Sequence, residues 1–116
     1  MRTVLVVEDD LLVQDVTRNE LEAAGYQVIV AANADEAIAV LEARRDIHLV
    51  FTDVHMPGSM DGAKLAVVVR DRWPPIHIIV TSGNERPVAL PADAVFISKP
   101  HISDTVVAAI RMFDGM

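Results

Sequence analysis

Acidic side chains stand at the ends of two short apolar runs of this sequence. In "FTDVHMP", residues 51–57, Asp53 ends an apolar stretch and a turn follows; in "VLVVEDD" the acids Glu8, Asp9 and Asp10 end another. Carboxylates a few ångströms apart repel each other by roughly 4 kcal/mol per pair at an effective dielectric constant of about 20. If the two runs are neighbouring strands, their ends need compensating charge. A hard divalent cation with oxygen ligands, Mg²⁺ or else Mn²⁺, is the natural source.

Two further groups suited to phosphate chemistry follow later apolar runs. Thr81 and Ser82 come after "HIIV", and Lys99 comes after "VFIS". Once a cation neutralises the acids, a carboxylate such as Asp53 can attack a phosphoryl group and form an aspartyl phosphate. The transferring group also needs positive charge and donors around its equatorial oxygens, which Lys99 and the Thr81 hydroxyl supply. One reaction therefore accounts for each of these residue types.

The elements that must position these groups are five short apolar runs separated by stretches with helical spacing. Each run is rich in Val and Ile and largely non-alternating, which is typical of strands buried on both faces. The predicted strands are Thr3–Val7, Gln27–Ala31, His48–Thr52, Ile76–Thr81 and Ala94–Ile97.

Helix signals lie between and after these runs. The stretch Leu11–Ala24 ends at Gly25, a natural helix stop. Asn33 and Glu36 resemble a capping box, and a helix Gly62–Trp73 follows Asp61 as its candidate N-cap. The predicted inward face of the first helix consists of Val13, Val16, Thr17, Leu21 and Ala24. Glu20 falls in the middle of that face, and the pattern does not explain it.

Strands that alternate with helices indicate an α/β fold with a parallel sheet and helices on both faces. In such sheets ligands bind at the carboxyl ends of the strands, where the acids, the hydroxyls and the lysine all stand. With 116 residues the chain suits one domain. A net charge of −7 argues against nucleic acid as the main ligand. The chain contains no cysteine and no apolar run of the ~20 residues that span a bilayer, so we expect a cytoplasmic protein without membrane contact.

Four sequence blocks resemble the response-regulator receiver domain of two-component signalling. They are "VVEDD", "FTDVHMPGSMDG", "IIVTSG" and "ISKP", and they follow the first, third, fourth and fifth predicted strands in the family's order. The resemblance covers essentially the whole chain. It implies a single receiver domain over residues 1–116, with a (βα)5 flavodoxin-like, doubly wound, five-stranded parallel sheet in the order 2-1-3-4-5.

The resemblance also implies a role for each acid at the sheet edge. Asp53 is the expected phosphoacceptor. Glu8, Asp9 and Asp53, together with the backbone carbonyl of His55, are the expected Mg²⁺ ligands, Asp9 more directly and Glu8 through water. Asp10 is expected to be solvated or to serve as a helix N-terminal charge.

The remaining implied roles concern the response to phosphorylation. Thr81 is the expected switch hydroxyl, Phe96 the switch aromatic, and Lys99 the lysine that contacts the phosphoryl group. A histidine kinase or a phosphotransfer protein would donate the group, and the shape change would alter a protein–protein interaction. The oligomeric state and the output partner are not defined by the sequence. The end of the chain one helix after Lys99, with a natural-looking Met1, favours a stand-alone receiver.

Two other functions compete with this interpretation. A Mg²⁺-dependent phosphatase of the haloacid-dehalogenase type also uses an aspartate nucleophile, but it needs a second aspartate two residues on, where His55 stands. A receiver-like interaction module that is never phosphorylated is disfavoured by the intact acid, hydroxyl and lysine set.

One segment departs from the family pattern. Only seventeen residues separate Thr81 from Lys99, and the segment "GNERPVALPAD" contains Pro87 and Pro91. A proline disrupts a helix interior by about 3 kcal/mol. We therefore expect the family's fourth helix to be absent or reduced to about one turn within Asn84–Asp93, and this stretch to be the most mobile part of the domain.

Overall fold

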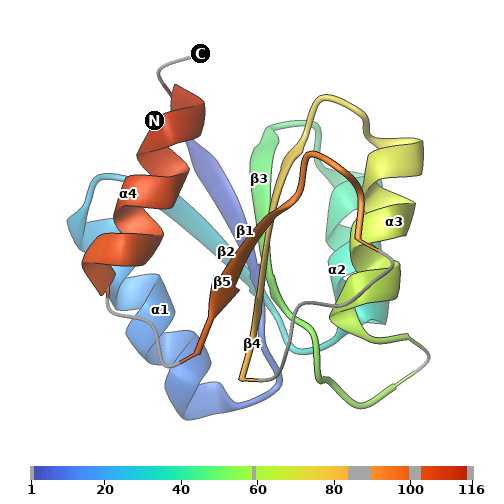
Figure 1. Ribbon diagram of the computed structural model, residues 1–116, viewed down its shortest axis with the longest axis horizontal. Coiled ribbons are helices and arrows are strands. Elements are labelled where there is room, and N and C mark those ends of the chain that lie inside the picture. Colours follow the sequence, from blue (N-terminus) through green and yellow to red (C-terminus); the bar gives the residue numbers. More distant parts are fainter. Residues whose placement is uncertain (1, 59, 84–89, 100–102, 115–116) are drawn as a thin grey trace.

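The chain alternates five strands with helices (Figure 1). The computed structural model describes residues 2–58, 60–83, 90–99 and 103–114. The elements are β1 (Thr3–Val7), α1 (Leu11–Ala23), β2 (Gln27–Ala31), α2 (Ala34–Ala43), β3 (Ile47–Asp53), α3 (Gly62–Arg72), β4 (His77–Ser82), β5 (Val95–Ser98) and α4 (Ser103–Asp114). All five predicted strands are confirmed, and their bounds agree with the prediction to within one residue at each end.

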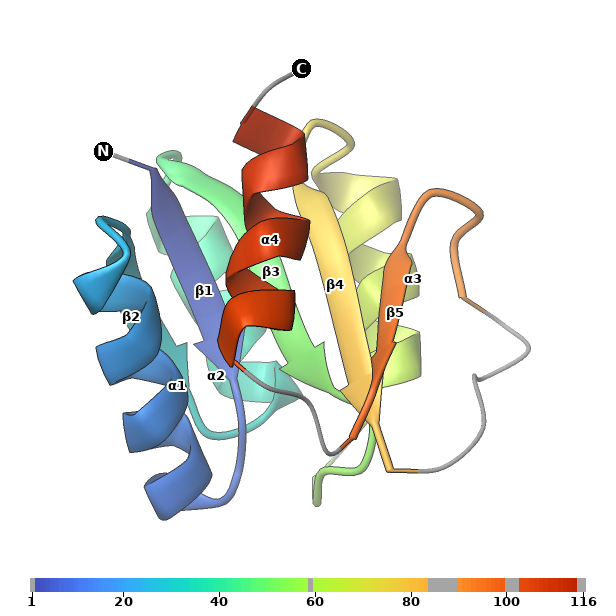
Figure 2. The same ribbon diagram turned by 60° about the vertical axis from the view of Figure 1, so that its left-hand side comes forward.

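The five strands form one parallel sheet in the order β2-β1-β3-β4-β5, as expected. Helices α1 and α4 cover one face of the sheet, and α2 and α3 cover the other (Figures 1 and 2). The carboxyl ends of the strands therefore all lie at one edge, the lower edge in Figure 1. This edge holds the residues that the sequence singles out for chemistry.

Alternate side chains of the central strands fill two apolar cores, one on each face of the sheet. Leu5 and Val7 of β1 belong to the core under α2 and α3, whereas Val4 and Val6 belong to the core under α1 and α4. Successive side chains of a strand point to opposite faces, so a strand covered on both sides is apolar throughout. Full burial stabilises each such Val or Leu side chain by about 1.5–3 kcal/mol.

Side-chain caps fix where the helices begin. The Asp61 carboxylate accepts a hydrogen bond from the Lys64 backbone N–H at 2.9 Å, and the Asn33 side chain accepts one from Glu36 N–H at 2.9 Å. Both predicted N-caps are therefore confirmed. Helix α1 ends one residue before its expected end, and Gly25 follows with a φ of 99°, a left-handed conformation that glycine adopts without strain.

The predicted inward face of α1 is wrong in part. Val13 and Val16 are 38% and 49% exposed, and the buried side chains of this helix are Gln14, Thr17 and Leu21. The spacing of the buried residues is still helical, but the face is rotated from the one that the valines suggested. This rotation explains Glu20, which lies at the margin of the true inward face and not in its middle.

The described residues contain no helix between β4 and β5. Gly83 and residues 90–94 are non-helical, with a turn closed by a 3.0 Å hydrogen bond from Ala94 N–H to the Pro91 carbonyl. Over these described residues the connection agrees with the expected loss of a helix. Residues 84–89, on which most of that expectation and the prediction of mobility fall, lie outside the described residues. Within the described residues, none of the helices combines the length and the apolar character that crossing a membrane requires.

Candidate functional site

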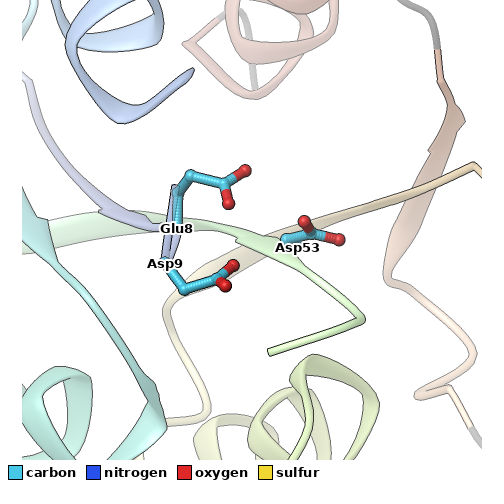
Figure 3. A group of neighbouring side chains, drawn as sticks. All are labelled: Glu8, Asp9 and Asp53. Atoms are coloured by element: carbon cyan, nitrogen blue, oxygen red, sulfur yellow. The ribbon is translucent and has the colours of Figure 1, made fainter. Parts of the chain in front are cut away.

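The ends of β1 and β3 bring three carboxylates together. Val7, the last residue of β1, pairs with Thr52 of β3, so the acids that follow each of these residues are neighbours. One carboxylate oxygen from each of Glu8, Asp9 and Asp53 lies within 4.8 Å of the others (Figure 3). The sequence predicted this cluster from the strand ends, and the structure places all three residues in it.

The surroundings of the cluster raise the pKa of Glu8. The pKa of the Glu8 carboxyl is raised to about 7, chiefly by burial and to a smaller extent by the negative charge of Asp53, while a hydrogen bond from the Asp10 backbone N–H opposes the shift. Glu8 and Asp53 are buried, and Asp9 is exposed. An oxygen-rich group of this kind suits a hard divalent cation, which would relieve the repulsion.

Lys99 supplies part of the missing positive charge. Its Nζ lies 2.7 Å from Asp53 Oδ2 and 3.8 Å from Glu8 Oε1. The lysine follows β5, and its backbone N–H donates to the Ser82 carbonyl at 2.8 Å, which fixes it against the end of β4. A single ammonium cannot balance three carboxylates, so the cluster retains a net negative charge.

The hydroxyl of Thr81 is buried and has no hydrogen-bond partner. Thr81 lies directly opposite Asp53 in the β3–β4 pairing, and its Oγ1 is the one buried side-chain polar atom without a partner in the described part of the chain. Leaving a buried donor unsatisfied costs about 1–3 kcal/mol. Such an atom needs an explanation, and the simplest is a partner that arrives with a ligand.

A close approach of α3 shapes the backbone after Asp53. A Cβ atom on Gly62 would lie 1.9 Å from the Asp53 carbonyl oxygen, so only glycine fits at this position. The Gly62 backbone N–H donates to the Val54 carbonyl at 2.8 Å, and the His55 N–H donates to Asp53 Oδ1 at 3.2 Å. The "DG" pair of the sequence block thus caps α3 and brings it against the strand end that carries Asp53.

Gln14 supports the site and was missed by sequence reasoning. Its buried Nε2 donates to the Glu8 carbonyl at 3.1 Å and to the Ala31 carbonyl at 3.4 Å. The side chain therefore ties α1 to the ends of β1 and β2, next to the acids. The spacing of Gln14, Thr17 and Leu21 was the available signal, but the valines of the same helix gave a stronger apolar pattern.

Two other predicted residues lie beside the cluster without joining it. Asp10 is the N-cap of α1, since its carboxylate accepts from Leu12 N–H at 3.0 Å and Val13 N–H at 3.2 Å. Phe96 lies on β5 opposite Val80 and packs, half-buried, against the core under α2 and α3. The candidate switch residues therefore occupy adjacent strands, one residue apart in register.

The family model of the response regulator receiver domain matches residues 4–111. The chain belongs to the response regulator receiver domain family. Receivers are signalling modules of two-component systems, and Mg²⁺ binding and phosphorylation are typical of them. No comparison favours a phosphatase of the haloacid-dehalogenase type.

Curated relatives carry a receiver as one part of a longer protein. The hydrogenase transcriptional regulatory protein HoxA of Cupriavidus necator is 36% identical over 115 residues, covering 94% of this chain and 23% of the relative. The nitrogen assimilation regulatory protein NtrX of Azorhizobium caulinodans is 32% identical over 110 residues, covering 90% of this chain and 24% of the relative. This receiver thus spans about a quarter of the length of these relatives.

Solved receiver structures have the same fold. The receiver domain of the hybrid histidine kinase CckA aligns with a TM-score of 0.80 at 32% identity, covering 95% of this chain and 96% of that one. A CheY-like receiver domain protein from Methanospirillum hungatei JF-1 aligns with a TM-score of 0.86 at 26% identity, covering 97% and 93%. These likenesses agree with the flavodoxin-like order of the sheet.

Proposed function

We propose that residues 1–116 form a single receiver domain that accepts a phosphoryl group on Asp53 from a histidine kinase or a phosphotransfer protein. The observation that supports this most directly is the unpartnered, buried hydroxyl of Thr81 opposite Asp53. A phosphoryl oxygen on Asp53 would give that hydroxyl its acceptor. We place the protein in the cytoplasm, where such donors act. The only group that it would phosphorylate is its own Asp53.

In the proposed reaction an Asp53 carboxylate oxygen attacks the phosphorus atom of a phosphohistidine. The new P–O bond forms as the P–N bond breaks, and the imidazole nitrogen leaves with the electron pair of that bond. The Lys99 ammonium, which lies 2.7 Å from Asp53 Oδ2, would pair with the phosphoryl oxygens as they gain charge. The Thr81 hydroxyl would donate a hydrogen bond to one of these oxygens. Attack of water on the same phosphorus atom reverses the modification.

The donor set at the site fits a divalent cation. Three carboxylates lie within 4.8 Å of one another, and the pKa of Glu8 is raised by its burial and, to a smaller extent, by the negative charge of Asp53. We assign Glu8, Asp9, Asp53 and the backbone carbonyl of His55 as the groups that hold Mg²⁺ or Mn²⁺. When bound, the cation neutralises the carboxylates and so permits an anionic donor to approach.

An apolar surface beside the site is suited to the phosphodonor protein. Leu11 and Leu12 at the start of α1 are 70% and 74% exposed, and Val16 lies one turn further on the same helix. Exposed leucines next to a reactive group indicate a contact surface for another protein. Its position beside Asp9 would bring a donor histidine to the open side of the cluster.

The proposal is tested by phosphorylation of Asp53 variants. We expect acetyl phosphate with Mg²⁺ to add one alkali-labile phosphoryl group, measured by intact mass. Asp53→Asn should abolish the addition, whereas Asp71→Asn, an exposed aspartate on α3, should leave it unchanged. Equal labelling of Asp53→Asn, or no labelling of the wild type by acetyl phosphate or by any of a panel of histidine kinases, would contradict the proposal. The second outcome would favour the unphosphorylated interaction module.

A further inference from the structure

A cavity opens at the edge of the sheet opposite the carboxylate cluster. It has a volume of about 620 Å³ and lies where α2 and α3 end and β3 and β4 begin, at the upper edge in Figure 1. Pockets that bind small molecules typically measure about 300–1,000 Å³. The usual ligand position of this fold is the other edge of the sheet, so the receiver function does not account for this cavity.

The cavity wall combines an apolar part with one aromatic ring. Leu41, Ile47 and Ile76 are buried side chains of the core under α2 and α3, and they line the cavity from below. Trp73 lies beside them, half-buried, immediately after α3. This part of the wall is apolar.

Arginines surround the apolar part. The Arg72 guanidinium lies 4.4 Å from the centroid of the Trp73 ring and 2.8 Å from a Glu42 oxygen, and Arg44 pairs with Asp46 at 2.7 Å. Arg45 is exposed and forms no ion pair within the residues that the structure describes. These arginines are three of the ten basic residues of a chain whose net charge is −7.

We propose that this cavity, lined by Arg44, Arg45, Arg72 and Trp73, binds a small organic anion that carries a flat aromatic ring. The ring would contact the apolar wall and Trp73, and the anionic group would pair with Arg45. Guanidinium groups match carboxylate, phosphate and sulfonate oxygens geometrically. The chain as a whole carries a net charge of −7, so charge complementarity favours an anion at this cluster of arginines over a position beside the acids.

The existing ion pairs do not by themselves explain the arginine cluster. Exposed pairs such as Arg44–Asp46 are screened by solvent and add little to stability. The ion pairs with Asp46 and Glu42 do, however, hold the guanidinium groups of Arg44 and Arg72 at the cavity rim. Arg45 is left as the cation that an incoming anion can engage without breaking a pair.

Trp73 provides a direct readout because it is the only tryptophan in the sequence. Its indole N–H gives a single ¹⁵N–¹H cross-peak, which we would follow in cation-free buffer during titration with naphthalene-2-sulfonate. We expect a saturable shift with a dissociation constant below about 1 mM. The neutral ring 2-naphthol and the ring-free anion sulfate should each bind at least about tenfold more weakly, because each lacks one of the two contacts.

Matched charge reversals test the site. Arg45→Glu should weaken naphthalene-2-sulfonate binding about tenfold or more, whereas Arg111→Glu, an exposed arginine of α4, should leave it unchanged. Asp53→Asn should also bind normally, which separates this site from phosphorylation. The proposal is overturned if no saturable shift occurs, if Arg45→Glu binds as tightly as the wild type, or if 2-naphthol binds equally well. The last result would identify a plain apolar crevice.

Discussion

Glu8 is buried, although its proposed role as a metal ligand requires an ionised carboxylate. Its carboxylate is buried beside Asp53, and its pKa is raised to about 7 chiefly by that burial. A carboxyl whose folded-state pKa lies above its ordinary value of 4.5 favours the folded state below pH 4.5. That contribution is lost as the pH rises through about 7, because the folded protein must then hold an ionised group in a poorly solvated place.

We therefore expect Glu8→Gln to stabilise the metal-free protein at pH 8. Gln keeps the shape of the side chain but never ionises, so its advantage should be largest above pH 7 and should disappear near pH 4.5. Thermal unfolding in EDTA at several pH values measures the difference. Added Mg²⁺ should stabilise the wild type more than the variant, because the variant lacks a carboxylate that we assign as a Mg²⁺ ligand. A variant that is less stable than the wild type at pH 8 in EDTA would contradict the assignment of the raised pKa.

Gln14 gives a second prediction at the scale of single residues. Gln14→Met keeps the volume but leaves the carbonyls of Glu8 and Ala31 without this donor, which should cost about 1–2 kcal/mol of unfolding free energy. Because the side chain ties α1 to the end of β1, we also expect weaker Mg²⁺ binding, measured by calorimetry. Asn19→Met, at an exposed position of α1, is the control and should alter neither quantity. Unchanged Mg²⁺ affinity together with lost stability would reduce Gln14 to a structural role.

At the scale of elements, the strands were easier to predict than the orientation of the helices. Short Val- and Ile-rich runs define strands buried on both faces, and parallel pairing then fixes which ends meet. The acids, Thr81 and Lys99 therefore fell into one cluster from sequence alone. The face of α1 was harder, because Val13 and Val16 are exposed and the buried Gln14 is polar. Hydrophobic spacing cannot identify a polar side chain that is buried to satisfy two carbonyls.

The contact between α3 and β3 was likewise hidden from the sequence. The pair Asp61–Gly62 was recognisable as a cap and a motif, but the reason for glycine is a backbone approach that only the fold reveals. The cavity at the other edge of the sheet was also not predicted. Its arginines come from two segments about thirty residues apart, and only the pairing of β3 with β4 brings these together.

Gly62→Ala tests the importance of this approach between elements. The added Cβ would meet the Asp53 carbonyl and the backbone of Val54, so α3 or the end of β3 must move. Overpacking of this kind costs roughly 1–3 kcal/mol, and contact with rigid backbone should place the cost at the upper end. Denaturant unfolding measures it, and acetyl phosphate labelling should fall as Asp53 shifts.

The matched substitution for Gly62→Ala is Gly83→Ala. A Cβ on Gly83 would meet nothing within 4 Å, and this glycine has no left-handed backbone, so the change should be nearly neutral. Equal effects at the two glycines would mean that α3 does not constrain Asp53.

At the scale of the whole molecule, the parallel sheet separates the carboxylate cluster from the arginines around the cavity. The carboxylates of Glu8, Asp9 and Asp53 gather at the carboxyl ends of the strands, and the arginines around Trp73 gather at the amino ends. The proposed phosphorylation of Asp53 would add a further charge of about −1.5 to −2 beside these carboxylates, at their edge of the sheet. The two adjacent strands β4 and β5 connect that edge with Phe96, so they are the natural route by which the added charge alters the surface.

The last prediction concerns this route. Beryllofluoride with Mg²⁺, a mimic of the phosphoryl group, should shift the backbone amide signals of β4 and β5, because the Thr81 hydroxyl turns to it and Phe96 repacks. Moving such an equilibrium from 1:99 to 99:1 needs about 5.5 kcal/mol of preference, which charge-assisted hydrogen bonds to Thr81 and Lys99 together can supply. Thr81→Ala should still bind beryllofluoride but lose most of the β5 shifts. Thr105→Ala, an exposed threonine of α4, should retain them. If Thr81→Ala keeps the full set of β5 shifts, the Thr81 hydroxyl does not couple the added charge to Phe96. Lys99, which follows β5, would then be the next residue to replace.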